Sequence, residues 1–277
     1  MKKFILVLIL VFSIWVIWGN TRVSTRVIEV KSEKIPSSFN EYKIAHISDY
    51  HNKDWDEKIL IPLRNSKPNI IAITGDLIDS RKTNTDVSID FVKKALEIAP
   101  VYYVSGNHEG RYSGYNSFKA DLEALGVEAL ENESKEHFST LSSESIQIIG
   151  VNDPNFTRKT SELNTNYKIL ESFIDPINDL EKFTILLSHR PEQYKLYQDK
   201  QIELTLSGHA HGGQFRIPFI GAIYAPGQGF FPKYTSGLYE LEKGAQLIVS
   251  RGLGNSMIPI RINNNADLII IELKSSI

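Results

Sequence analysis

Six short apolar runs along the chain each end in side chains that bind metal ions or transfer protons. Five of the seven histidines directly follow these runs, together with aspartates and asparagines. A single Asp-x-His or Gly-Asp pair is common by chance, so it is the ordered series that indicates a shared site. The runs at 43–48, 70–74 and 101–105 precede Asp49-Tyr50-His51, Gly75-Asp76-Leu77-Ile78-Asp79 and Gly106-Asn107-His108-Glu109, and those at 146–151, 183–188 and 204–207 precede Asn152-Asp153, His189-Arg190 and Gly208-His209-Ala210-His211.

The mixture of ligand types indicates divalent cations of intermediate hardness. Carboxylate, amide oxygen and imidazole together suit manganese, iron or zinc, whereas an all-oxygen cage would suit magnesium or calcium. Two such ions about 3.5–4 Å apart need one carboxylate between them and can share a hydroxide. We therefore expect two divalent metal ions, with Asp76 as the bridging ligand.

The elements that carry these side chains alternate between two patterns. Amphipathic stretches at 57–64, 87–99 and 117–125 separate the early apolar runs, which predicts βαβ units and a largely parallel sheet in the first half. Ligands of such sheets bind beyond the carboxyl ends of the strands, so the candidate side chains should converge in one crevice. Glycine, proline and aromatic residues follow Gly213, and further strands are predicted at 238–241, 246–250 and 267–273.

Length and composition limit the classes of protein. A chain of 277 residues with 42% hydrophobic residues can bury one sizeable core, so we expect one catalytic domain over 43–277 after a linker at 21–42 that contains a candidate first strand, 23–30. The formal charge of −2 argues against nucleic acid as an obligatory partner. The absence of cysteine excludes disulfides and thiol catalysis. No protein partner is predicted.

The first 20 residues resemble a membrane segment. Lys2 and Lys3 precede an apolar run at 4–18, which is short for a span of roughly 20 residues but ends in tryptophans suited to the interface. Bulky residues occupy the place where a cleavage site needs small ones, which favours an uncleaved anchor over a signal peptide. The lysines would stay in the cytoplasm, with the catalytic domain outside; secretion after cleavage is the alternative.

The series of blocks resembles that of the calcineurin-like metallophosphoesterases, in the same order from Asp49 to His211. The end of this series and the lysine-flanked N-terminus resemble the bacterial membrane-associated branch, which includes proteins similar to the UDP-2,3-diacylglucosamine hydrolases. The resemblance implies an α/β fold, a four-layer α-β-β-α sandwich of two mixed β-sheets. One departure is Tyr50, where close relatives more often have leucine.

The resemblance also implies a role for each residue. His108 would contact the phosphate, either to stabilise charge or to protonate the leaving oxygen. One metal ion would be held by Asp49, His51, Asp76 and His211, and the other by Asp76, Asn107, His189 and His209.

Several residues near the motifs have two interpretations. Arg190 and Arg251 are candidates to bind a phosphate oxygen, and the alternative is a structural ion pair. Asp79 is expected to support the site or cap a helix, and Glu109 either to orient His108 or to be solvated.

Other residues are kept out of the site. His46 is expected in the core with a hydrogen bond, and His137 on the surface. Asn152 and Asp153 are expected to support the site without binding metal. Aromatic residues are expected either to line the substrate pocket or to pack loops, namely Tyr112, Tyr115 and the segment 224–234.

The function that follows is hydrolysis of a phosphodiester or pyrophosphate by a metal-bridging hydroxide. The anchor favours a substrate that is a lipid or a cell-envelope molecule, and a nucleotide or a general phosphodiester is the alternative. The alternative is a catalytically silent scaffold with the same fold. A serine hydrolase is excluded, because no Gly-x-Ser-x-Gly motif is present.

Overall fold

Two six-stranded mixed sheets make up the centre of the part of the chain that the structure, a computed structural model, describes: residues 2–156, 163–255 and 258–276. The first sheet has the order β1 (Val23–Ser32), β16 (Ala266–Ser275), β2 (Lys43–Ile47), β3 (Ile70–Thr74), β4 (Val101–Val104) and β5 (Glu128–Ala129). The second has the order β14 (Gly237–Glu240), β15 (Gln246–Val249), β9 (Leu204–Ser207), β8 (Thr184–Leu187), β7 (Ser145–Gly150) and β6 (Glu133–Phe138).

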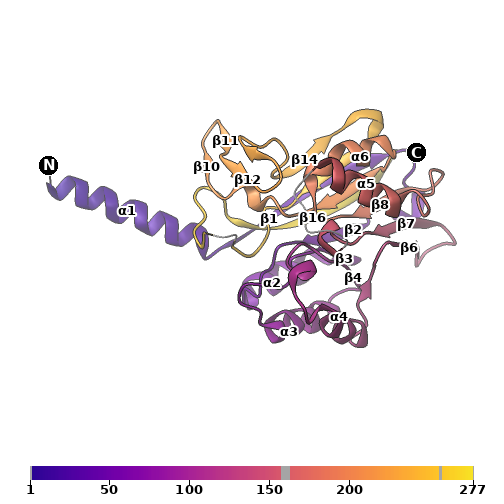
Figure 1. Ribbon diagram of the computed structural model, residues 1–277, viewed down its shortest axis with the longest axis horizontal. Helices are drawn as coiled ribbons and strands as arrows, with labels where there is room; N and C mark the ends of the chain where they lie inside the picture. Colours follow the sequence, from indigo (N-terminus) through magenta and orange to yellow (C-terminus); the bar gives the residue numbers. More distant parts are fainter. Residues whose placement is uncertain (1, 157–162, 256–257, 277) are drawn as a thin grey trace.

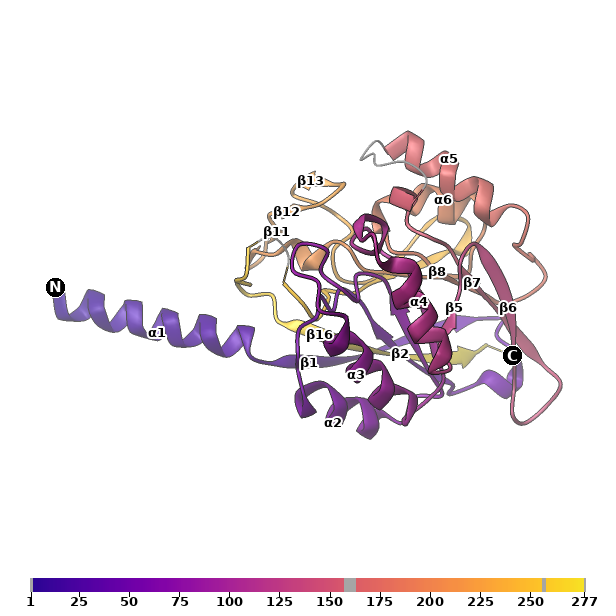
Figure 2. The same ribbon diagram turned by 60° about the horizontal axis from the view of Figure 1, so that its bottom comes forward.

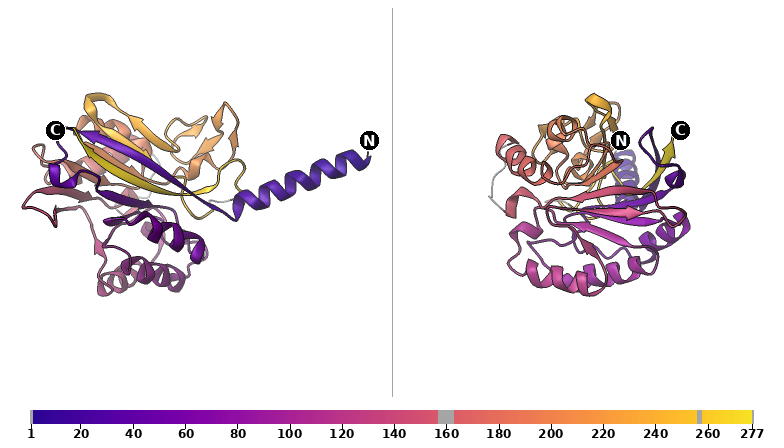
Figure 3. Two further views of the ribbon diagram at one scale, coloured as in Figure 1. Left: turned by 180° about the vertical axis from the view of Figure 1, so that it is seen from behind. Right: turned by 90° about the vertical axis from the view of Figure 1, so that its right-hand side faces the viewer.

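Helices cover the outer face of each sheet, which confirms the four-layer α-β-β-α sandwich (Figures 1 and 3). The first sheet is covered by α2 (Glu57–Ser66), α3 (Thr85–Leu96) and α4 (Tyr115–Ala124), and the second by α5 (Leu163–Ile174) and α6 (Tyr194–Asp199). In β3, Ile71 and Ile73 pack under the helices, whereas Ile70 and Ala72 face the other sheet. Because successive side chains alternate, a strand buried on both faces must be continuously apolar, as the sequence of β3 is.

Short elements connect these layers. They are the hairpins β10 (Arg216–Ile217) with β11 (Gly221–Ala222) and β12 (Tyr224–Ala225) with β13 (Gly229–Phe230), and the 3₁₀ helices η1 (Ser37–Phe39), η2 (Glu109–Arg111), η3 (Pro154–Phe156), η4 (Pro191–Gln193), η5 (His211–Gly213) and η6 (Glu242–Gly244).

The segment at 21–42 is not a linker. The candidate first strand at 23–30 is present as β1, and it pairs in parallel with β16 over ten residues, from Val23 opposite Ala266 to Ser32 opposite Ser275. Residues 23–32 therefore belong to the same sheet as β2, β3 and β4. Two helices that were not predicted, α5 and α6, cover the second sheet.

The N-terminal helix α1 (Lys2–Asn20) projects from the domain as an isolated helix (Figure 2). None of its residues is buried, and it is long and apolar enough to cross a membrane, although a signal sequence would have the same properties. Its last residue is fixed to the domain by two hydrogen bonds, from the Asn20 side-chain amide to the Arg261 carbonyl and from the Arg261 amide to Asn20 Oδ1, each 2.8 Å.

Candidate metal centre

The predicted ligands lie at the carboxyl ends of strands from both sheets. Asp49 follows β2 and Asp76 follows β3 in the first sheet, while His189 follows β8 and His209 follows β9 in the second. Asp49, Asp76 and His209 have left-handed backbones, with φ of 50°, 52° and 63°. Such conformations are costly for residues with a side chain and gather at functional sites. The sharp turns direct side chains from two sheets into one space.

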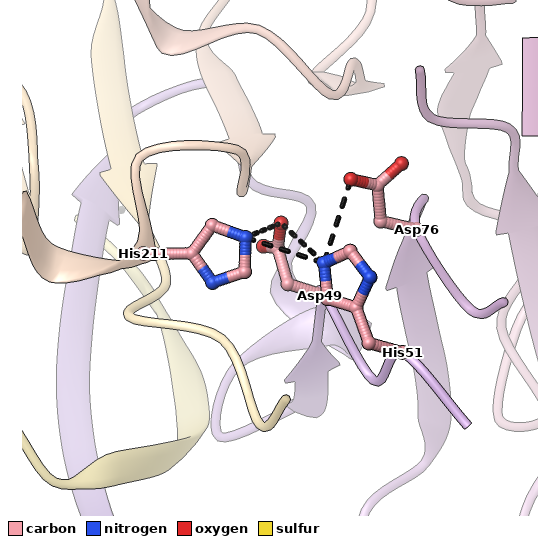
Figure 4. A group of neighbouring side chains, drawn as sticks. All are labelled: Asp49, His51, Asp76 and His211. Atoms are coloured by element: carbon pink, nitrogen blue, oxygen red, sulfur yellow. Dashed lines mark hydrogen bonds and ion pairs between the residues drawn. The ribbon is translucent and has the colours of Figure 1, made fainter. Parts of the chain in front are cut away.

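The first group of ligands is compact and buried (Figure 4). Asp49, His51, Asp76 and His211 each offer one ligand atom, and these atoms lie within 4.8 Å of one another. His211 Nε2 is 3.3 Å from Asp49 Oδ1, and His51 Nε2 is 3.6 Å from Asp76 Oδ2. The two imidazole Nε2 atoms are 3.2 Å apart. Two nitrogens and two carboxylates at such distances fit around one cation.

The second group shares Asp76 with the first. His189 Nε2 is 3.3 Å from Asp76 Oδ2, and His209 Nδ1 is 3.2 Å from His189 Nε2. Asn107 lines the same cavity as Asp76 and His209. Its Oδ1 is buried, and no hydrogen-bond donor reaches it within the described residues. A buried amide oxygen without a donor is costly, so the donor set fits a cation that Asn107 would help to bind.

Burial leaves three of the four ligand histidines neutral, whereas His189 carries a proton that a cation would displace. Burial lowers the pKa of His51 to about 3 and holds the pKa of His209 and His211 well below the usual range. Burial also acts to lower the pKa of His189, but the Asp76 carboxylate outweighs it and raises that pKa to about 10. His51, His209 and His211 are therefore neutral, with lone pairs ready for a cation.

The ring of His108 has a defined tautomer. The backbone amide of Ser80 donates to His108 Nδ1 over 2.9 Å, so this nitrogen carries the lone pair and Nε2 carries the proton. Burial lowers the pKa of His108, which keeps the ring neutral. His108 lines the cavity beside Asn107 and Asp76, where an N–H group can donate to a substrate oxygen.

Glu109 has a structural role that the sequence did not reveal. Its side chain is completely buried, and it accepts backbone N–H groups from Asp76 (2.9 Å), Gly106 (2.7 Å) and Ile78 (3.1 Å). Both predicted roles were wrong, because Glu109 is not solvated and accepts no hydrogen bond from the His108 ring. It holds the turns after β3 and β4 together. Gly106 permits this approach, since a Cβ there would lie only 2.3 Å from Asp76 Oδ1.

Four of the predicted ligands line a cavity of about 360 Å³, namely Asp76, Asn107, His209 and His211. His108 lines the same cavity, and so do Tyr224, Pro226 and Ile258. Two arginines, Arg81 and Arg111, also line it. The cavity therefore combines ligand atoms, cationic groups and an apolar wall.

Arg190 lies away from this cavity. It is 4% exposed and donates to both oxygens of Asp153, from Nε over 2.7 Å and from Nη2 over 3.0 Å, while Nη1 is 3.3 Å from Glu192 Oε1. The predicted substrate contact is replaced by a buried ion pair that also explains Asp153. Arg251 donates to the Ser236 hydroxyl over 2.8 Å. The arginines at the cavity are Arg111, two residues after Glu109, and Arg81, two residues after Asp79.

Of the two remaining histidines, one has the predicted position and the other does not. His46 is buried, with its Nε2 2.8 Å from Thr74 Oγ1, which confirms the predicted core position. His137 is half-buried between the hydroxyls of Tyr42 and Tyr102, at 2.6 Å and 2.9 Å, so the prediction of an exposed residue was wrong.

The residues predicted to lie around the ligands also have different positions in the structure. Asp79 accepts hydrogen bonds from the Arg81 side chain, which lines the cavity, and it is not the residue that precedes α3, because α3 begins at Thr85 after Asn84. Asn152 accepts a 3.0 Å hydrogen bond from the Ser105 hydroxyl. Of the aromatic candidates, Tyr224 lines the cavity, while Tyr115 belongs to the core under the helices and Tyr112 packs against it.

The comparisons with known proteins agree with this geometry. Residues 42–213 match the family described as calcineurin-like phosphoesterases. The chain is 30% identical over 254 residues to the metallophosphoesterase YkuE of Bacillus subtilis, a match that covers 89% of this chain and 84% of that protein. It is 26% identical over 258 residues to a transmembrane protein with metallophosphoesterase domain from Danio rerio, over 90% of this chain and 57% of the relative.

A solved structure supports the fold. The crystal structure of the protein TT1561 from Thermus thermophilus matches with a TM-score of 0.50 at 14% identity, covering 77% of this chain and 90% of that one. Together with the motifs, the match over 42–213 and the identity over most of the chain show that this protein belongs to the calcineurin-like phosphoesterase family.

Proposed function

We propose that this protein hydrolyses a phosphodiester or pyrophosphate with two divalent cations, which are manganese, iron or zinc. The observation that carries the proposal is the position of Asp76, which belongs to both groups of ligand atoms. Asp49, His51 and His211 complete one set, and Asn107, His189 and His209 complete the other. Bound there, the cations would supply an activated water and neutralise charge on the phosphate oxygens.

The residues around the cations have two further tasks. His108 donates its Nε2 proton to a phosphate oxygen or to the leaving oxygen, as its tautomer and place in the cavity support. Arg111 binds an anionic part of the substrate. It is exposed and lines the cavity, and within the described residues its guanidinium has no ion pair or hydrogen bond. A guanidinium in that position matches a phosphate in bidentate fashion.

The proposed location is the cell membrane. α1 would cross the bilayer once, with Lys2 and Lys3 in the cytoplasm and the catalytic domain outside. The exposed apolar helix and the likeness to a transmembrane protein with the same domain support anchoring. A cleaved signal segment, which would give a secreted protein, is the alternative that N-terminal analysis of the mature protein tests. On this basis a lipid or cell-envelope phosphoester is the proposed substrate class.

Metal analysis and a chromogenic assay test the proposal together. The full chain is purified, its metal content is measured, and hydrolysis of bis(p-nitrophenyl) phosphate and of a pyrophosphate diester is followed with and without added manganese. We expect two ions per chain and turnover of one or both substrates. A folded chain that binds two ions and is inert on every phosphoester would instead support the silent scaffold.

A further inference from the structure

Large exposed apolar side chains gather on the segments that also carry the cavity-lining residues Gln214, Tyr224 and Ile258. Phe219 is fully exposed, Phe230 is 75% exposed and Phe231 is 67% exposed. Clusters of this kind on a soluble surface mark sites of interaction. We call this set the apolar rim: Phe219, Ile220, Phe230, Phe231, Ile258 and Ile260.

The rim is one connected surface, although it comes from three segments. The β10–β11 hairpin is bonded to the segment after Ile260, since the Arg216 amide donates to the Ile262 carbonyl over 3.0 Å. The β12–β13 hairpin is bonded to the first hairpin, since the Phe231 amide donates to the Ile223 carbonyl over 2.8 Å and the Ile223 amide donates to the Phe215 carbonyl over 3.0 Å. These bonds connect the three segments, which also carry the cavity-lining residues Gln214, Tyr224 and Ile258.

The backbone at two rim positions would suit other residues better. Phe219 and Phe231 have φ of 68° and 51°, a left-handed conformation that is uncommon for bulky residues and easier for glycine or asparagine. A phenylalanine at these positions is unfavourable for two reasons: its backbone conformation is strained, and its exposed apolar ring contacts water. Local strain of this type gathers at functional sites, which supports a role for the side chain itself.

The rim lies on the side of the domain from which α1 departs. In Figures 1 and 2 the hairpins β10 to β13 lie near the domain end of α1, while β6 and β7 lie on the opposite side. The two hydrogen bonds between Asn20 and Arg261 join the end of α1 to the residue directly after Ile260. The guanidinium of Arg22 lies 4.4 Å from the Trp18 ring centroid, a pair suited to the interface between lipid and water.

We propose that the apolar rim rests in the outer part of the same bilayer that α1 crosses, so that the catalytic cavity opens onto lipid headgroups. Because the rim is joined to the end of α1, we infer that the bilayer which α1 crosses is what contacts the rim. Ile258 belongs both to the rim and to the cavity wall, so a lipid that enters keeps its chains against the rim. The phosphate then meets the ligand groups, Arg81 and Arg111. The substrate is therefore an amphiphilic lipid phosphoester, an assignment that rests on the proposed function.

Site-directed labelling tests the membrane contact without any need for activity. The chain contains no cysteine, so the single variants Phe219→Cys and Phe230→Cys can each carry one environment-sensitive fluorophore. The matched control is Leu141→Cys, which is 82% exposed in the turn between β6 and β7. The full chain is reconstituted in vesicles of phosphatidylcholine and phosphatidylglycerol that contain lipids with a quencher in the acyl chain.

The expected result is a difference between the two sides of the domain. Labels at 219 and 230 should shift their emission to shorter wavelength and be quenched by the lipids, whereas the label at 141 should show neither change. Equal quenching at all three positions, or none at 219 and 230, would overturn the proposal.

A kinetic experiment tests the substrate class. The double variant Phe219→Asn/Phe231→Asn replaces both side chains by a residue that tolerates the left-handed backbone, and Leu141→Asn is the control. We expect kcat/KM for a fluorescent phosphatidylglycerol in vesicles to fall about tenfold. The fall is no larger because α1 still holds the enzyme at the membrane. Turnover of bis(p-nitrophenyl) phosphate should be unchanged.

The outcomes separate the two proposals. An equal fall on both substrates, or no fall on the lipid, would overturn the role of the rim. Turnover of the soluble diester by the parent protein without turnover of the lipid would overturn the substrate class. If the parent turns over neither, the proposed function fails, and the labelling still decides whether the rim contacts the membrane.

Discussion

The ligand groups and the cavity wall are built from different kinds of structure. Asp49, Asp76 and His189 are buried and follow strands whose neighbours fix them on both sides. Tyr224 and Ile258 belong to short hairpins and loops and are half-exposed. The side chains that need fixed distances to a metal ion thus follow strands of the sheets. The side chains that would contact a substrate lie on loops, which vary more easily in sequence. Changes in the first region should therefore affect every substrate, and changes in the second only some.

The strongest test of this difference is Asp76→Asn. The variant removes a carboxylate from both ligand groups, so we expect loss of both ions and a fall in turnover of at least about 10⁴-fold on all phosphoesters. Metal content and kcat are measured on the same preparation. Asp90→Asn, at an exposed ion pair with Lys94, is the control and should keep both properties. An active Asp76→Asn variant would show that the two groups do not act as one centre.

His108→Asn should separate chemistry from metal binding. The amide oxygen of asparagine can still accept from the Ser80 N–H, but the variant has no ring N–H to donate. Turnover should fall by about 10² to 10⁴-fold while two ions stay bound. Loss of metal from this variant would make His108 a ligand and contradict the role given to it.

Glu109→Gln should weaken the scaffold under the ligands. A glutamine places an N–H group against at least one of the three backbone N–H groups that the carboxylate accepts. We expect a loss of about 1–3 kcal/mol in the free energy of unfolding, measured with urea. Glu97→Gln, on an exposed glutamate, should change it little. Unchanged stability in Glu109→Gln would mean that the turns after β3 and β4 keep their conformation without the hydrogen bonds to Glu109.

Arg111→Gln should give the smallest effect and one that depends on the substrate. We expect kcat/KM to fall by about tenfold, mainly through KM, because one charge-assisted contact is lost in binding. Arg64→Gln on the exposed face of α2 is the control and should be neutral. A fall in kcat alone would move Arg111 from substrate binding to the reaction itself.

The sequence was most informative where the fold forces neighbouring strands to end together. The ligand series from Asp49 to His211 could be predicted, because the carboxyl ends of parallel strands meet at one edge of a sheet. The strands that carry the ligand motifs were equally visible as short apolar runs, whereas β6 is polar and was not predicted. The helix α5 was missed, although the spacing of Leu170 and Ile174 on its buried face was the available signal.

Contacts between distant segments could not be predicted. Arg190 and Arg111 both follow a ligand motif, and only the position of Asp153 decides that the first is drawn into the core. The burial of Glu109 depends on three backbone N–H groups from two turns, which carry no sequence signal of their own. The role of β1 was also hidden, because its partner lies far along the chain.

That distant pairing has a consequence for the order in which the protein is made. Val23 lies opposite Ala266, so β1 waits for a partner that the ribosome adds only after nearly all of the other strands. α1 directly precedes β1 and is made long before the sheet is complete, so in the proposed topology it enters the bilayer during that time. Late pairing across such a separation is slow. The nascent domain would therefore fold while already tethered, with its first strand exposed to chaperones until translation reaches β16.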